Sequence, residues 1–105
     1  PNSPASIPSP RPPAPIRLLV VDDHEMVLAG LRAILGLESD LRIVGEASNA
    51  EEALSLHRAC RPDVTLLDLR LADGSGLEVL RRILETSPAA AVILLTTYDY
   101  EQMAH

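Results

Sequence analysis

Four short runs of aliphatic residues constrain the fold of this chain more than any other feature of its sequence. They occupy residues 16–21, 41–47, 64–67 and 91–95. The runs lack the regular alternation of apolar and polar residues that marks a half-exposed strand, so we expect strands that are covered on both faces. The second run contains Arg42, Gly45 and Glu46 and therefore predicts a strand at an edge of the sheet.

Helical patterns lie between these runs. Over residues 25–37 the apolar residues recur at spacings of three and four, which predicts an amphipathic helix. Two further helices are predicted to begin at Asn49 and at Ser75, because a glutamate follows each of them three residues later, as is typical of a helix N-cap. Strands and helices therefore alternate, and this order predicts an α/β fold with a parallel sheet and helices on both faces.

The first fifteen residues differ from the rest in composition, because they contain seven of the nine prolines. Proline lacks a backbone donor, and this segment has little apolar surface to bury, so we expect residues 1–15 to form a disordered tail. A polyproline ligand for a partner domain is the alternative interpretation. Residues 16–105 are expected to form a single domain.

Charge and composition exclude several classes of function. The net charge is −6 and aromatic residues make up only 2% of the chain, which disfavours contact with a phosphate backbone or stacking on nucleic-acid bases. Cys60 is the only cysteine, so no disulfide forms within the chain, as is usual in a reducing compartment. No apolar stretch approaches the roughly 20 residues of a membrane span. We therefore expect a cytoplasmic protein without membrane contacts.

Candidate site residues, three carboxylates and a hydroxyl, follow three of the four aliphatic runs. Asp22 and Asp23 follow the first run, Asp68 follows the third and Thr96 follows the fourth. In an open parallel sheet the carboxyl ends of the strands share one edge, and ligands collect there, between the first and third strands in flavodoxin-like winding. An aspartate after a strand is usually a turn or cap residue when it stands alone. Three of them at one edge instead indicate a shared site.

Carboxylates about 5 Å apart repel each other by roughly 3 kcal/mol at an effective dielectric constant of 20. A Mg²⁺ ion would offset this repulsion, because it favours a few carboxylate oxygens and retained waters. We predict that Asp22 and Asp23 form a metal platform and that Asp68, alone on the central strand, is a nucleophile toward a phosphoryl group. The hydroxyl of Thr96 would donate to an oxygen of that group.

Longer motifs extend this pattern over residues 16–105. They comprise residues 18–27, 44–47 with 52–54, 62–71, 76–80 and 92–97. In content and spacing they resemble the receiver domains of two-component response regulators, in particular the NarL/LuxR-type subgroup. The resemblance implies a flavodoxin-like, doubly wound parallel sheet with strand order 2-1-3-4, followed in complete receivers by a fifth strand and a last helix.

The resemblance also implies roles for individual residues. Asp68 would be the phosphoacceptor and Thr96 the switch hydroxyl. Asp22, Asp23 and Asp68, with the backbone carbonyl of Arg70, would hold Mg²⁺. The implied partner is a sensor histidine kinase, and DNA would be bound only through a C-terminal domain outside this chain. Such a module is a phosphoacceptor with slow autodephosphorylation and not an enzyme with turnover.

Two departures from the family pattern stand out. Ala72 occupies the position, four residues after Asp68, where the family usually has proline. The sequence ends at His105, before the expected fifth strand and last helix, so the domain is expected to be incomplete and to lack the phosphate-binding lysine; the chain contains no lysine at all. The strand at 91–95 would then have a free edge, which predicts self-association as a dimer or larger species.

Two other interpretations of the sequence compete with the receiver. A magnesium-dependent phosphatase of the haloacid dehalogenase type also uses an aspartate nucleophile, but it needs a second acid two residues later, where Arg70 stands. A truncated receiver that acts only as a dimerisation fragment is a third interpretation. His24, beside the acid pair, could touch the phosphoryl group or the metal, but we favour a histidine that faces solvent at the start of a helix.

Overall fold

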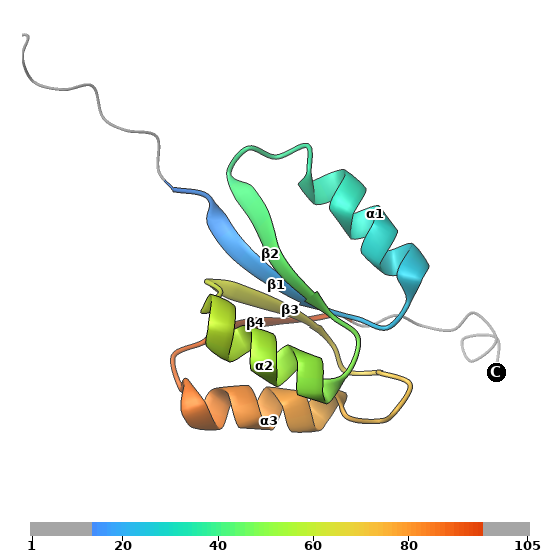
Figure 1. Cartoon of the computed structure of the whole chain (residues 1–105), viewed down its shortest axis with the longest axis vertical. Helices are drawn as coiled ribbons and strands as arrows, with labels where there is room; N and C mark the ends of the chain where they lie inside the picture. The colour runs from blue at the N-terminus through green and yellow to red at the C-terminus, as the bar shows by residue number, and fades with distance from the viewer. Residues whose placement is uncertain (1–13, 96–105) are drawn as a thin grey trace, which may run out of the picture.

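The computed structural model describes residues 14–95 (Figure 1). Its strands and helices alternate along the chain: β1 (Ile16–Val21), α1 (Glu25–Leu35), β2 (Leu41–Ala47), α2 (Ala50–Cys60), β3 (Val64–Asp68), α3 (Gly76–Thr86) and β4 (Ala91–Leu95). The strands form one parallel sheet in the order β2-β1-β3-β4. The predicted fold class and the strand order 2-1-3-4 are therefore confirmed.

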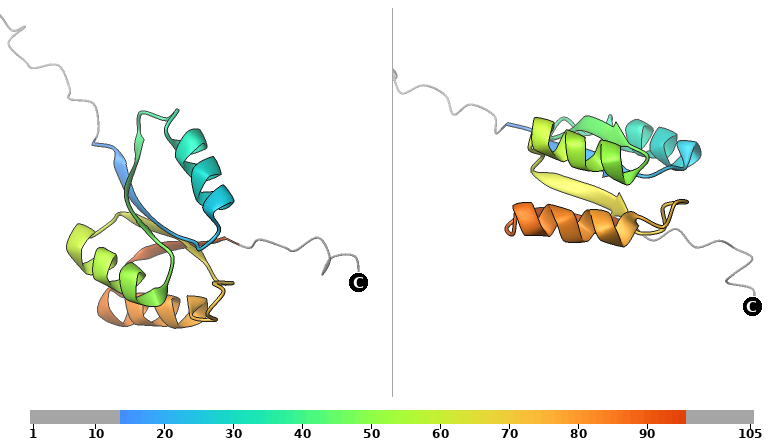
Figure 2. Two further views of the ribbon diagram at one scale, coloured as in Figure 1. Left: turned by 45° about the vertical axis from the view of Figure 1, so that its right-hand side comes forward. Right: turned by 60° about the horizontal axis from the view of Figure 1, so that its bottom comes forward.

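The helices form two layers on opposite faces of the sheet (Figures 1 and 2). Helices α2 and α3 lie side by side on one face, and α1 covers part of the other face. The predicted amphipathic helix ends at Leu35, two residues before its expected end, and Gly36 caps it. None of the helices described over residues 14–95 is long and apolar enough to cross a membrane.

The core explains why the strand runs lack alternation. On β1, Leu19 and Val21 face α2 and α3, whereas Val20 packs with Leu28 of α1. Both faces of β1 are thus covered, and its last four residues are all buried. The second strand is mostly half-buried, and it lies at the edge, as its mixed composition predicted. Burial on both faces favours consecutive apolar residues, as in residues 18–21 of β1.

The two predicted helix caps have different outcomes. The Asn49 side chain accepts a hydrogen bond from the Glu52 backbone N–H at 2.9 Å, and the predicted cap of α2 is therefore confirmed. The Ser75 side chain makes no cap bond. Its hydroxyl donates instead to Asp73 Oδ1, two residues earlier. Ser75 is the N-cap residue of α3, as predicted, but its side chain bonds to Asp73 and accepts no helix N–H.

The strand β4 forms the opposite edge of the sheet within the part of the chain that the structure describes. It pairs with β3 alone, and its side chains are less covered than those of the inner strands. Ile93 is 53% exposed and Leu94 is 45% exposed, although both are large apolar residues. The apolar sequence of this edge therefore carries exposed hydrophobic surface on both of its faces.

Candidate functional site

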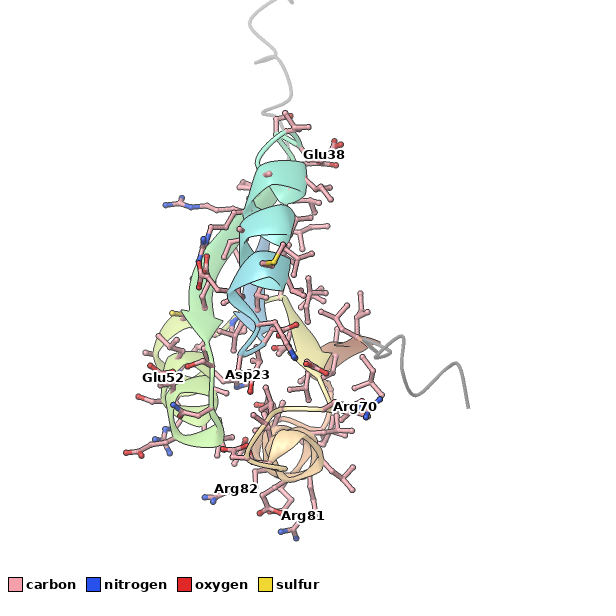
Figure 3. All side chains as sticks on the ribbon, turned by 90° about the vertical axis from the view of Figure 1, so that its right-hand side faces the viewer. Asp23, Glu38, Glu52, Arg70, Arg81 and Arg82 are labelled. Atoms are coloured by element: carbon pink, nitrogen blue, oxygen red, sulfur yellow. The ribbon has the colours of Figure 1, made fainter. Side chains whose placement is uncertain are left out.

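The topology brings the predicted carboxylates together at the end of the sheet where the strands terminate. Asp22 directly follows β1, and its backbone N–H donates to the Ala47 carbonyl at the end of β2. Asp68 is the last residue of β3, which is the neighbour of β1 on its other side. The side chains of both aspartates are completely buried, and that of Asp23 is 18% exposed. In Figure 3 this edge faces the viewer, with Asp23 near its centre.

One oxygen of each carboxylate accepts a hydrogen bond from a backbone N–H group. The His24 N–H donates to Asp22 Oδ1 and the Arg70 N–H donates to Asp68 Oδ1, each at 2.8 Å. The Ala72 N–H donates to Asp23 Oδ2 at 2.6 Å. These bonds fix the three side chains to the loops that follow β1 and β3, so the carboxylates are oriented by the backbone.

Ala72 therefore contributes to the site through its backbone. Proline has no N–H group, so the hydrogen bond to Asp23 depends on the absence of proline at this position. The loop between β3 and α3 thereby joins the acid pair after β1 to the end of β3. From the sequence, Ala72 was only a departure from the family pattern. The hydrogen bond of its N–H to Asp23 could not be predicted, because it depends on the path of the loop.

The second oxygen of each carboxylate is buried without a hydrogen-bond partner among residues 14–95. These oxygens are Oδ2 of Asp22, Oδ1 of Asp23 and Oδ2 of Asp68. A buried, unpaired carboxylate oxygen is costly, because it has lost water without gaining a donor. Three such oxygens at one edge of a sheet suit a cation, which would supply the missing partner to all of them.

His24 lies closer to this cluster than we expected. Its Nδ1 is 2.7 Å from Asp22 Oδ1, 3.3 Å from Asp23 Oδ1 and 3.6 Å from Asp68 Oδ2. The ring is half exposed, so the expectation that it faces solvent is right only for part of the side chain. The hydrogen bond to Asp22 and the charges of the three aspartates raise the pKa of His24, against a smaller opposite effect of burial.

A hard divalent cation fits the donor set. Asp22, Asp23, His24 and Asp68 each offer one ligand atom, and these atoms lie within 4.8 Å of one another. The three carboxylates supply the oxygen ligands that Mg²⁺ prefers, and the partly open cluster leaves room for retained waters. The imidazole is a poorer ligand for Mg²⁺ than for softer metals, so the carboxylates are the better candidates for ligands.

The remaining predicted site residues have separate outcomes. Thr96 lies outside the described residues, but it follows Leu95, which is the register partner of Asp68. The backbone N–H of Arg70 contacts Asp68, while the role of its carbonyl as a metal ligand stays a prediction. The Arg70 side chain points outward from the edge that carries the cluster (Figure 3).

Comparison with known proteins identifies the family. Residues 18–105 match the family described as the response regulator receiver domain. The chain belongs to this family. As a receiver domain of two-component response regulators, it is a member of a class of signalling domains and not of a class of enzymes. The family match thus favours the receiver interpretation over the phosphatase.

Individual relatives agree with this identification. The chain is 41% identical over 87 residues to the DNA-binding transcriptional activator DevR/DosR of Mycobacterium tuberculosis, covering 83% of this receiver and 40% of the relative. It is 33% identical over 88 residues to the nitrate/nitrite response regulator NarL of Escherichia coli, covering 84% and 41%. The receiver therefore spans about 40% of the length of these curated relatives.

Solved structures show the same fold. A LuxR-family two-component response regulator from an Aurantimonas species superposes with a TM-score of 0.75 at 32% identity, covering 87% of this chain and 65% of that one. The receiver domain of the putative regulator NarL from Mycobacterium tuberculosis superposes with a TM-score of 0.72 at 33% identity, covering 83% and 70%. These likenesses confirm the resemblance to the NarL/LuxR-type subgroup.

Proposed function

We propose that this receiver accepts a phosphoryl group on Asp68 from a phosphohistidine of a sensor histidine kinase. The observation that carries the proposal is the state of the Asp68 carboxylate. Its Oδ1 is held by the Arg70 N–H, while its Oδ2 is buried, unpaired and directed into the acidic cluster. One oxygen is thus fixed and the other is available as a nucleophile.

In the proposed reaction Asp68 Oδ2 attacks the phosphorus atom of the phosphohistidine. A P–O bond forms to Asp68 and the P–N bond breaks, and the electron pair of that bond returns to the imidazole of the kinase. The product is an acyl phosphate on Asp68. The Thr96 hydroxyl, one residue beyond the register partner of Asp68, would donate to an oxygen of the bound phosphoryl group.

Asp22, Asp23 and Asp68 would hold Mg²⁺, with the Arg70 carbonyl as a further oxygen ligand. The bound ion supplies neutralisation of the negative charge on the carboxylates and on the incoming phosphoryl group. The backbone bonds from His24, Ala72 and Arg70 keep the carboxylates oriented without using the oxygens that face the cluster. Asp22 Oδ2 and Asp23 Oδ1 thus remain available to the ion, beside Asp68 Oδ2 as the nucleophile.

Phosphorylation from a small donor tests the proposal. With acetyl phosphate and Mg²⁺, intact mass spectrometry should detect one phosphoryl group on the chain, and Asp68→Asn should abolish it. Chelation of Mg²⁺ should also abolish it. Because the chain has no lysine to bind the phosphoryl group, the yield should be lower than in a receiver that has one. Asp73→Asn, which removes an exposed carboxylate of the neighbouring loop, is the matched control and should leave the yield unchanged. Label on any residue other than Asp68 would contradict the assignment.

Metal binding is tested separately by amide NMR. Titration with Mg²⁺ should shift the amides next to Asp22, Asp23 and Asp68, with weak affinity because few protein oxygens contact the ion. Asp23→Asn should weaken binding at least tenfold, since it removes the most exposed of the three carboxylates and one charge. Asp73→Asn should bind as the parent does. If the largest amide shifts lie outside the carboxylate cluster, the proposed metal site is refuted.

The output of the receiver is proposed from its relatives. DevR/DosR is described as a DNA-binding transcriptional activator, and it is longer than this chain. We infer that DNA binding belongs to a segment beyond the receiver and that the receiver controls it through phosphorylation in the cytoplasm. The negative charge of the chain agrees with this division, because a DNA-contacting surface is normally basic.

Self-association is proposed through β4. Ile93 and Leu94 expose apolar surface at an edge strand, and covering a few hundred Å² would stabilise a dimer by several kcal/mol at about 25 cal/mol per Å². Sedimentation at micromolar concentration should show a dimer or larger species, and Ile93→Lys should shift it toward the monomer. Met26→Lys, at an exposed apolar position on α1, is the control and should have no effect. A monomeric parent with cooperative unfolding would exclude this interface.

A further inference from the structure

The two ends of the sheet, where the strands begin and where they end, differ in charge. The carboxylate cluster lies at the carboxyl ends of the strands. At the opposite end lie the end of α2, with Arg58 and Arg61, and the start of β1, with Arg17. Although the net charge of the chain is negative, these arginines lie together at the end of the sheet opposite the proposed phosphorylation site.

A cavity of about 610 Å³ lies in this region, open to solvent. It is lined by His57, Arg58, Arg61, Pro62, Thr86, Ser87 and Ala90. A smaller adjoining hollow adds Arg82 of α3 to Arg58 and His57. Arg58 and Arg61 thus line the larger cavity, and Arg82 lines the smaller hollow beside it. The volume of the larger cavity lies in the range of small-molecule sites.

The arginines of the cavity and of the adjoining hollow form no close ion pair among the described residues, although the pKa of Glu78 is lowered by its hydrogen bond with Arg81 and also by the charge of Arg82. Among residues 14–95, the side chains of Arg58, Arg61 and Arg82 make no ion pair or hydrogen bond. The neighbouring Arg81 behaves differently, because it pairs with Glu78 at 2.7 Å and with Glu85 at 3.3 Å. In Figure 3, Arg82 leaves α3 on the side nearer to α2 and Arg81 on the other side.

Stabilisation of helix ends explains only part of this arrangement. Arg58 lies in the last turn of α2, where a positive charge favours the helix dipole. Arg61 lies beyond the helix, in the left-handed region at φ 46°, where a non-glycine residue is uncommon. Its carbonyl accepts a hydrogen bond from the Arg17 guanidinium at 3.0 Å, which fixes the backbone of the cavity wall.

The acid that follows the cavity residue Pro62 in the sequence is bound elsewhere. Asp63 follows Pro62 in the sequence, and its Oδ2 accepts a hydrogen bond from the Arg17 backbone N–H at 2.8 Å. That carboxylate is therefore bound to the start of β1. Arg58 and Arg61 therefore give the cavity lining a positive charge, because no carboxylate is among its lining residues.

We propose that this cavity is a binding site for a small anion that carries two or more phosphate groups. Guanidinium groups match phosphate oxygens with paired N–H donors, and two or three of them around one cavity suit a multivalent anion better than a single phosphate. The Ser87 side chain borders the same space and adds a hydroxyl. The site lies at the end of the sheet where the strands begin, opposite the end that carries Asp68. It does not depend on the proposed phosphorylation.

Inorganic pyrophosphate is the probe for a test by amide NMR, with EDTA present to keep metal ions from the carboxylate cluster. Saturable shifts are expected at Arg61, Ser87 and Ala90. Arg58→Gln and Arg82→Gln should each weaken binding at least fivefold. Arg81→Gln removes the same charge from an adjacent position of α3 and should bind as the parent does.

Several outcomes would overturn the site. These are equal affinity of Arg82→Gln and Arg81→Gln, shifts that never saturate, and shifts that centre on the carboxylate cluster. Thermal unfolding of each variant verifies its fold. If a variant fails to fold, the shift map of the parent still decides, because it locates the bound anion without any substitution.

Discussion

Replacement of Gly76 by alanine is expected to destabilise the domain by about 3 kcal/mol or more, at the upper end of what overpacking costs. Gly76 is the first residue of α3 and is buried. A Cβ atom there would lie 2.6 Å from both the carbonyl carbon and the Cα of Leu69, and closer still to the Leu69 carbonyl oxygen. These are backbone atoms of the residue after Asp68, so relief of the clash must move the loop that holds the site.

Chemical denaturation with and without Mg²⁺ measures both consequences. Gly76→Ala should lower the free energy of unfolding and also weaken Mg²⁺ binding, because the loop carries the Ala72 and Arg70 amides. Gly30→Ala is the matched control, since nothing lies within 4 Å of a Cβ at that exposed helical position. It should stabilise the domain by about 0.5–1 kcal/mol through helix propensity. Equal stabilities of Gly76→Ala and the parent would show that α3 does not require this close approach.

Without metal, Asp68→Asn is expected to raise the free energy of unfolding by about 1–3 kcal/mol, although it removes the phosphoacceptor. Three carboxylates whose ligand atoms lie within 4.8 Å of one another repel at this edge. The repulsion of one pair amounts to roughly 3 kcal/mol at an effective dielectric constant of 20, and a protonated His24 offsets part of it. Asparagine keeps the acceptor for the Arg70 N–H and places an amide donor among unpaired oxygens.

Thermal and urea unfolding in EDTA and in saturating Mg²⁺ measure this effect. In EDTA the variant should be more stable than the parent. In Mg²⁺ the difference should shrink or reverse, because the parent gains about 2.7 kcal/mol at a ligand concentration of 100 times its dissociation constant. Asp40→Asn should show neither effect, since this carboxylate is exposed and lies on the loop before β2. A variant less stable than the parent in EDTA would mean that the cluster does not strain the metal-free domain.

The sequence predicted the sheet well because burial on both faces leaves a simple signature. The residues of β1 are apolar at every position that faces a helix layer, so the run itself marks an inner strand. The strand order came from the resemblance to receivers, since apolar runs alone do not rank their neighbours. The proximity of Asp22 and Asp68 followed from that order, because parallel strands end at one edge.

The details of the site depended on the paths of loops and were less predictable. The bond from the Ala72 N–H to Asp23 crosses 49 residues of sequence and follows from the path of the loop after β3. The contact of His24 with Asp22 had a weak signal, which was its position directly after the acid pair. Ser75 takes the predicted N-cap position, but its side chain bonds to Asp73 and not to the helix.

The placement of the cluster on two neighbouring inner strands has a kinetic consequence. Asp22 follows β1 and Asp68 ends β3, and the chain between them contributes a helix, the edge strand β2 and a second helix. Such distant segments meet late, because closing a long loop costs entropy before the new contacts repay it. The mutual repulsion of the carboxylates is therefore absent during the early steps and arises only when β1 pairs with β3. The chain can thus carry a strained charged site without slowing the formation of its first elements, and relief of that strain should act mainly on the rate of unfolding.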